Sequence, residues 1–231
     1  MANASVKRKQ AKRAPEVRVG RPPRQLAGEV EDRILDAARR VFLAHGLGGA
    51  SIDEIARLAR AGKPTIYARY TSKEALFGAV VMRDAARTRS AFANREPEGD
   101  SIEERLVSVA TNLLMGLLTK DTVDFIRLAL AEVTRFPELA NFGRIARERG
   151  VEAVIHVLND LANSIDLSAF PAFAPDRVAK TTEHFLDLAV ERLFLRALFG
   201  ENPKQLRAAI DAHVRSGVVF FLAACQSPRS L

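Results

Sequence analysis

The chain of 231 residues is 48% hydrophobic and 27% charged, contains one cysteine, and has a formal net charge of +7 at pH 7. A chain of this length and composition buries a large core, and a single cysteine excludes an internal disulfide, as is usual in a reducing cytoplasm. The longest apolar run, residues 218–225, is far shorter than the ~18–20 residues of a membrane-spanning helix. No apolar segment of a signal peptide follows the basic N-terminus.

The first 28 residues form a basic arm that we expect to be disordered in isolation. They hold eight of the 35 basic residues and one of the 28 acidic residues, which leaves 27 of each sign in the rest of the chain. Residues 19–24 (VGRPPR) resemble half of an Arg-Gly-Arg-Pro element, in which an arginine such as Arg21 enters the narrow minor groove of A·T-rich DNA. A solvated tail that adds only nonspecific attraction to DNA fits the same residues equally well.

Residues 29–80, called the reader below, are predicted to form three short helices that share one core. The second and third helices are joined by a tight turn, and Ile66 and Tyr70 lie four residues apart, so that both can pack onto the second helix. Lys63, Pro64, Thr65, Tyr67, Ala68 and Arg69 then point outward, as in a helix-turn-helix that enters the major groove. The apolar stripes consist of Ile34, Leu35, Ala38, Val41 and Phe42, ending at Gly46, and of Ile52, Ile55, Ala56 and Ala59.

Helix starts are marked by three patterns of Ser or Thr followed three residues later by Glu, which predict capping boxes. Pro64 falls in the first turn of a helix, where its missing N–H costs nothing. The three patterns are Ser51 with Glu54, Thr71 with Glu74, and Ser101 with Glu104.

The reader resembles the DNA-binding domain of the TetR family of bacterial regulators. Arg60 stands where the family usually has glycine, and Gly62 where it usually has a serine cap. A left-handed backbone at Arg60 would cost roughly 1–2 kcal/mol, and the alternative is that Gly62 takes the permissive conformation. The matching residues are Ile55, Ala56, Ala59, Lys63, Pro64, Thr65, Ile66, Tyr67, Tyr70, Ser72, Lys73, Glu74, Ala75 and Leu76.

This resemblance implies a role for each matching residue. Thr65, Tyr67 and Arg69 correspond to positions that touch bases or phosphates, and Arg69 could read guanine or pair with a phosphate. Tyr70 is expected in the core. The residues that correspond to the leading end of the DNA-contacting helix are Lys63 and Pro64, and those that correspond to phosphate contacts are Ser51 and Lys73. Helix N-termini favour such contacts because they present free N–H groups and partial positive charge.

One predicted helix continues from the reader over residues 72–92, and beyond it the sequence predicts helices only, near residues 102–118, 123–135, 140–165, 177–199 and 204–224. We therefore expect an all-α chain, with a small helix-turn-helix reader followed by a larger ligand-binding and dimerisation bundle over residues 81–231. Residues 125–139 (FIRLALAEVTRFPEL) resemble the C-terminal domain of the AefR-like branch of the TetR family. The alternative for this segment is an ordinary helix–proline–helix junction.

Two apolar stripes near the C-terminus suggest a dimer in which two helices from each subunit form a four-helix interface, as in the TetR family. The alternative is that a stripe serves the core of its own subunit. The stripes are Leu186, Ala189, Val190, Leu193, Phe194 and Ala197, and Ile210, Val214, Gly217, Val218, Phe221 and Leu222.

A ligand pocket is implied by the resemblance rather than by any pattern. Our candidates for its lining lie on or beside apolar stripes, where plain core packing is the alternative. They are Asn112, Met115, Phe125, Asn159 and His184.

We expect a sequence-specific transcriptional regulator, a repressor that binds a palindromic operator as a homodimer and is released by a small-molecule effector. It would be a cytoplasmic bacterial protein without membrane contact, associated with the nucleoid when bound. The alternative is an architectural DNA-binding protein on the same scaffold that responds to no effector. The four histidines lack metal-ligand spacing and no nucleophile or phosphate-loop motif is present, so we expect no enzyme, no catalytic residue, no metal and no cofactor.

Overall fold

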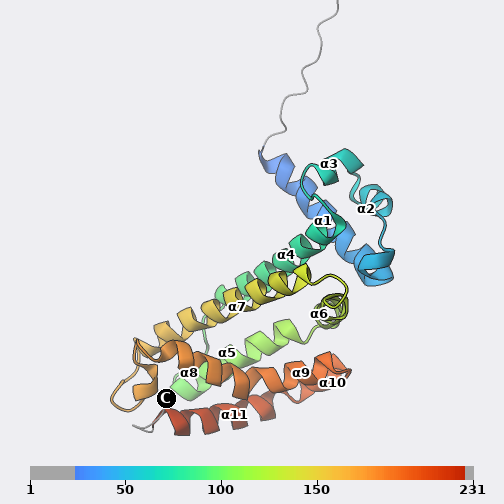
Figure 1. Cartoon of the computed structure of the whole chain (residues 1–231). Helices are drawn as coiled ribbons and strands as arrows, with labels where there is room; N and C mark the ends of the chain where they lie inside the picture. The colour runs from blue at the N-terminus through green and yellow to red at the C-terminus, as the bar shows by residue number, and fades with distance from the viewer. Residues whose placement is uncertain (1–23, 227–231) are drawn as a thin grey trace, which may run out of the picture.

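The computed structural model describes residues 24–226, which form helices and no strand (Figure 1). Arg21 and most of the predicted arm lie outside the described residues. No helix among those described is both long enough and apolar enough to cross a bilayer. The elements are α1 (Arg24–Gly49), α2 (Ile52–Ala59), α3 (Lys63–Tyr67), α4 (Lys73–Ala93), α5 (Ile102–Leu117), α6 (Lys120–Glu132), α7 (Glu138–Ala162), η1 (Pro171–Phe173), α8 (Val178–Leu186), η2 (Asp187–Glu191), α9 (Arg192–Leu198), α10 (Pro203–Ala208) and α11 (Ile210–Cys225).

The reader stands at one end of the bundle, and α4 runs from it along α7 (Figure 1). The predicted stripes of the first two helices are confirmed, because their residues are buried apart from the half-buried Ile52. Helix α1 begins at Arg24, so the last residues of the predicted arm are helical. Its regular course ends at Gly46, where φ is 67°; this left-handed value suits glycine, which has no Cβ to clash with the backbone.

The three predicted capping boxes have different outcomes. The box at α5 is confirmed, because Glu104 N donates to Ser101 Oγ (3.1 Å) and Ser101 N donates to Glu104 Oε2 (3.1 Å). At α2 the box is wrong, since the Ser51 side chain makes no cap bond. At α4 it is wrong by one residue: the helix begins at Lys73, so Ser72 occupies the cap position and accepts from Ala75 N (3.1 Å).

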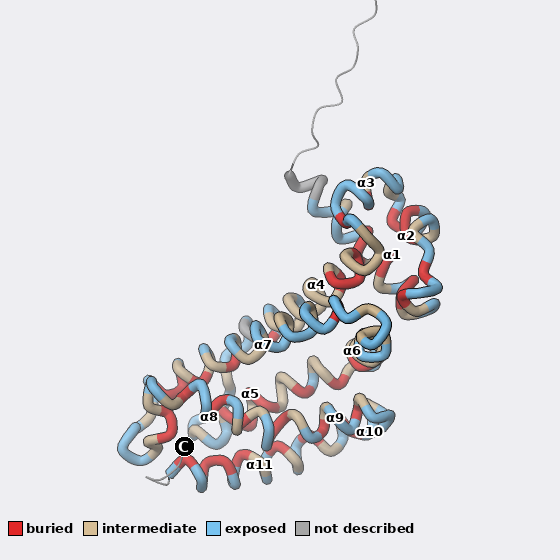
Figure 2. The backbone as a smooth tube through the Cα atoms, viewed as in Figure 1, coloured by how far each residue is buried: buried red, intermediate tan, exposed pale blue. Residues whose placement is uncertain are grey.

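The two C-terminal stripes lie in the core of their own subunit, so for the stripes the alternative interpretation is the correct one. Ala189, Val190, Leu193 and Ala197 are buried, as are Ile210, Val214, Val218, Phe221 and Leu222, while Leu186, Phe194 and Gly217 are half-buried. Figure 2 shows buried residues recurring along α11 on the side that faces the other helices. These helices are apolar on more than one side, because Leu188, Leu195, Val219 and Phe220 are exposed.

The predicted helices over residues 177–199 and 204–224 both contain irregularities that the pattern does not show. The first holds one wide turn, η2, between α8 and α9. There α11 comes so close that a Cβ on Gly217 would lie 3.0 Å from the Leu188 carbonyl oxygen. The second is divided at Ala209 into α10 and α11, and no glycine or proline marks the break.

Candidate nucleic-acid interface

Helix α3 is a short helix at the tip of the reader, on the side away from the bundle (Figure 1). It is anchored by Ile66 and Tyr70, which are 1% and 8% exposed. Lys63, Pro64 and Tyr67 of the helix are exposed, as are Ala68 and Arg69 directly after it, while Thr65 is half-buried. The Tyr67 side chain is 53% exposed, although a ring of its size is normally covered.

The turn before α3 is formed by Arg60 in the left-handed conformation, with φ 50° and ψ 44°. Arg60 N donates to Arg57 O (3.3 Å) and Ala61 N donates to Ala56 O (3.0 Å), so the turn satisfies carbonyls at the end of α2. Gly62 is extended, with φ −72°, and its carbonyl accepts from Thr65 N (2.9 Å). Of the two alternatives drawn from the sequence, the strained one at Arg60 is therefore correct.

Lys63, in α3, and Arg69, just after it, each make a solvent-exposed polar contact within the reader. Lys63 Nζ lies 2.6 Å from Asp53 Oδ1 on α2, and the hydrogen bond and charge of Asp53 raise the pKa of Lys63. Arg69 Nη1 donates to the Thr65 carbonyl (3.2 Å). Exposed contacts of this kind contribute little to stability, so a phosphate or a base edge can replace them.

Ser51 and Lys73, the two residues implied as phosphate contacts, flank the same connection between α1 and α2. Ser51 is exposed with an extended backbone, and its hydroxyl is not used to cap α2. Lys73 Nζ donates to Gly48 O (3.0 Å) and to Ala50 O (3.1 Å). The Lys73 ammonium thus holds the end of α1 in place, and a phosphate contact by either residue stays a prediction.

Tyr70 has a structural role, as expected. Its hydroxyl donates to Glu31 Oε1 (3.3 Å), and burial, together with Glu31, raises its pKa to about 12. Tyr70 remains neutral at physiological pH and ties the segment after α3 back to α1.

Ion pairs fasten α1 to α4 below the reading surface. Arg39 Nε lies 2.6 Å from Asp84 Oδ2, and Arg83 Nη1 lies 2.9 Å from Asp36 Oδ1. The Arg83 side chain is only 11% exposed, so solvent screens its pairs less than those on the surface. The reader is thereby coupled to α4, the helix that enters the bundle.

The five candidate lining residues of a ligand pocket lie in different surroundings. Phe125 is buried in the core of the reader and stacks on Phe77, with ring centroids 5.2 Å apart. Asn112 Oδ1 accepts from Arg95 Nη1 (3.0 Å). Met115 is exposed and lies 3.3 Å from Arg207 Nη2, while Asn159 and His184 are half-buried. Their assignment to a ligand site stays a prediction.

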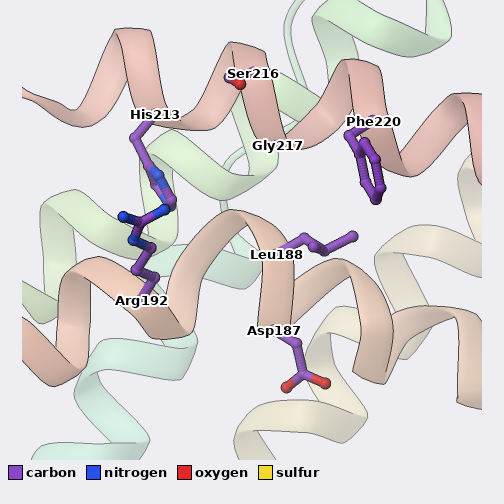
Figure 3. A pocket seen from close by; sticks show the side chains of 7 residues that line it. All are labelled: Asp187, Leu188, Arg192, His213, Ser216, Gly217 and Phe220. Carbon is purple, nitrogen blue, oxygen red and sulfur yellow. The ribbon is translucent and has the colours of Figure 1, made fainter.

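A pocket of about 360 Å³ lies between η2, the start of α9, and α11 (Figure 3). Leu188 and Phe220 point into it, and Arg192 reaches across toward His213 (Figure 3). None of the five candidates lines it. The full lining is Asp187, Leu188, Arg192, His213, Ser216, Gly217 and Phe220.

Sequence reasoning missed two residues whose side chains contact the reader's functional candidates or its backbone. Asp53 forms the ion pair with Lys63. The only feature of the sequence that could have indicated this pair is the position of Asp53 on the preceding helix, ten residues before Lys63. Glu132 Oε1 accepts from Leu47 N (3.0 Å) across 85 residues of sequence. The resemblance of residues 125–139 pointed to that segment but gave no role to any residue in it.

Comparison with known proteins identifies both halves of the chain. Residues 34–80 match the family model of bacterial regulatory proteins of the tetR family, and residues 104–226 match that of the AefR-like transcriptional repressor C-terminal domain. The HTH-type transcriptional repressor Rv1474c of Mycobacterium tuberculosis is 26% identical over 179 residues, which cover 78% of this chain and 88% of that protein.

Solved structures share the fold over nearly their whole length. A TetR-family regulator from Mesorhizobium loti MAFF303099 superposes with a TM-score of 0.73 and 24% identity, covering 85% of this chain and 96% of that one. The flavonoid-responsive regulator FrrA superposes with a TM-score of 0.67 and 27% identity, covering 87% and 99%. Because the C-terminal family model alone spans more than half of the chain, the protein belongs to the TetR family, in its AefR-like branch, and is a DNA-binding transcriptional regulator rather than an enzyme.

Proposed function

We propose that the chain is a homodimeric repressor that binds a palindromic operator and leaves it when a small molecule binds its helical bundle. The observation that carries the proposal is the outer surface of α3, where Lys63, Tyr67 and Arg69 are exposed around buried anchors. In the proposed complex Thr65, Tyr67 and Arg69 meet base edges or phosphates, with Lys63 and Pro64 at the leading end of the helix. Ser51 and Lys73 meet phosphates, which set the register on the duplex.

The dimer would form through the outer face of η2, α9 and α11. Leu188, Leu195, Val219 and Phe220 are exposed there, and Leu188 and Phe220 line the pocket of Figure 3. A second copy would cover this face in a two-fold arrangement. Such a dimer presents two copies of α3, and half-sites about 34–36 Å apart would match them.

We propose that the effector is a small, mainly apolar molecule. A bundle surrounds such ligands with apolar side chains and a few polar groups. FrrA is named for its response to flavonoids, and Rv1474c is named a repressor; these two names support an effector-released repressor here. The coupling free energy between effector and DNA can be no larger than the difference in the effector's binding free energy for the DNA-binding and the released shape of the dimer.

Selection of bound duplexes from a random-sequence pool, with the full-length chain, tests the DNA-binding part. We expect a palindrome, and mobility shifts on it should weaken when Tyr67 or Arg69 is replaced by alanine. Substitution of Asn141, an exposed residue of α7, serves as the control. Enrichment of no sequence at low salt would contradict the proposal.

Thermal-shift screening with small aromatic and apolar compounds tests the effector part, because a ligand of the folded state raises the melting temperature. A compound that raises it should also release the selected operator. If no compound does either, the architectural, effector-independent DNA-binding protein is the better description.

The basic arm is proposed to add to the affinity, with Arg21 in the minor groove. Each phosphate that a protein neutralises releases condensed counterions and steepens the dependence of affinity on salt. Deletion of residues 2–23 should therefore reduce the slope of log affinity against log salt concentration. An unchanged slope would exclude a DNA contact by the arm.

A further inference from the structure

Residues 125–139, the segment with the AefR-like resemblance, form the junction between the reader and the bundle. They comprise most of α6 and the turn into α7. Phe125 and Leu139 are buried in the same core as α1 to α4. Helix α7 comes so close to α4 that a Cβ on Gly78 would overlap the Phe142 ring. The reader therefore completes its core with side chains from the bundle.

One polar contact in this junction reaches the backbone of the reader directly. Glu132, the last residue of α6, accepts from Leu47 N with its Oε1 atom (3.0 Å). The contact falls where α1 loses its regular course: Gly46 has φ 67°, and a Cβ there would lie 3.2 Å from the same Glu132 oxygen. The Leu47 side chain is fully buried in the reader, so Leu47 moves together with the reader. The Glu132 carboxylate therefore links α6 to the reader as a whole.

The Glu132 main chain is fixed as well. Its carbonyl accepts from Arg135 N (3.0 Å) and from Phe136 N (2.8 Å), which forms the turn after α6. On the same helix, Arg127 donates to the carbonyls of Ala197 and Leu198 at the end of α9. Helix α6 therefore connects the end of α9, on one side, to the kink of α1, on the other.

We infer that Glu132 is a positioning residue for DNA binding: by holding Leu47 it fixes the kink of α1 and so sets the angle between the reader and the bundle. The inference rests on the proposed function, since it concerns two readers in one dimer. The angle determines the distance between the two α3 helices, and a palindrome demands one distance. Loss of the contact should loosen the angle while leaving the base-contacting surface intact.

Three substitutions of Glu132 distinguish the effect of its side-chain length, which brings an oxygen to Leu47 N, from the effect of its charge. Glu132→Gln keeps an oxygen that can accept from Leu47 N, but removes the charge. Glu132→Asp keeps the charge, but shortens the side chain by one methylene group and withdraws the oxygen from Leu47. Glu132→Ala removes both. Glu152→Ala is the matched control, because Glu152 is exposed on α7 and has no ion pair or side-chain hydrogen bond within residues 24–226.

The experiment uses the full-length chain and the operator that the wild-type protein selects from a random pool. Affinities are measured for that operator and for versions whose half-sites are one or two base pairs closer or further apart, and melting temperatures are measured in parallel. For the alanine and aspartate variants we expect the preference for the selected spacing to fall by roughly 5- to 20-fold, within the usual range of coupling between sites. For the glutamine variant and the control it should stay within about 3-fold of wild type.

The spacing preference distinguishes positioning from simple stabilisation. If Glu132 only stabilised the fold, the variants would melt earlier and lose affinity for all spacings by the same factor, which would overturn the inference. An aspartate variant that keeps the wild-type preference, or a glutamine variant that loses it, would overturn it too, because charge rather than reach would then matter. If the wild-type chain selects no DNA at all, the proposed function fails and the inference falls with it.

Discussion

The reader and the bundle are held together in different ways. The bundle closes an apolar core of its own, in which the buried polar side chains, Thr181 and Thr182, donate to backbone carbonyls. The reader combines ion pairs between α1 and α4 with an apolar core that includes residues of α6 and α7. The bundle therefore has a core of its own, whereas the core of the reader is shared with α6 and α7.

The sharpest test of this difference is Phe125→Ala. The ring is 3% exposed and stacks on Phe77, so its loss should cost about 3–5 kcal/mol of unfolding free energy. Hydrogen exchange should show the amides of α1 to α3 losing protection first, and operator binding should fall in step. Phe185→Ala, at a fully buried position of the bundle, is the counterpart and should expose α8 and α11 first. Equal loss of protection in both regions would show that they unfold as one unit.

A smaller effect of opposite sign is expected for Arg60→Gly. Arg60 has φ 50°, which costs a side-chain-bearing residue about 1–2 kcal/mol and a glycine little. Relief of this strain stabilises the folded variant, but glycine also gains conformational entropy in the unfolded chain, which offsets part of the gain. The unfolding free energy in urea should therefore rise by up to about 1 kcal/mol. Arg57→Gly, inside α2, removes the same charge and should instead destabilise the chain. Destabilisation by both would contradict the strain at Arg60.

The smallest expected effect compares two serines that precede helices. Ser101 caps α5 in the bundle, and Ser101→Ala should cost about 1 kcal/mol of unfolding free energy. Ser51 caps nothing in α2, so Ser51→Ala should leave the urea midpoint unchanged while lowering operator affinity if it contacts a phosphate. A matching loss of stability in Ser51→Ala would show that its hydroxyl supports the helix after all.

The capping box also gives the sign of a pH effect. Backbone N–H groups of Ser101 and Asp100 hold the pKa of Glu104 below its ordinary value of 4.5. Because the folded pKa is the lower one, the carboxylate adds stability above pH 4.5, and this contribution is lost as the pH falls through the folded pKa. Glu104→Gln should flatten the dependence of the urea midpoint on pH in that acidic range.

The reader could be predicted closely because its signals are local. Buried positions three and four residues apart marked α1 and α2, and Ile66 with Tyr70 fixed which side of α3 faces outward. The choice between Arg60 and Gly62 stayed open, since both lie within the same short turn and only the backbone angles decide. The cap of α4 was misplaced by one residue because Thr71 and Ser72 are both good caps.

The bundle was less predictable because its arrangement depends on distant residues. Helices α9 and α11 are apolar on several sides, so the pattern alone did not reveal which side meets the subunit's own core. The break at Ala209 carries no sequence signal. The contact of Glu132 with Leu47 joins positions 85 residues apart, and no spacing rule connects a helix end with a kink at that separation.

The ion pair of Lys63 with Asp53 gives the reader an internal competitor for the DNA backbone. In the proposed complex a DNA phosphate can bind the Lys63 ammonium only by displacing the Asp53 carboxylate, which lies 2.6 Å from it. The displaced carboxylate then repels the negatively charged DNA strand. Arbitrary duplexes thus gain less from this lysine than its formal charge suggests. Because every duplex presents the same phosphates, this competition would weaken binding to all sequences alike and would leave the choice of sequence to the base contacts.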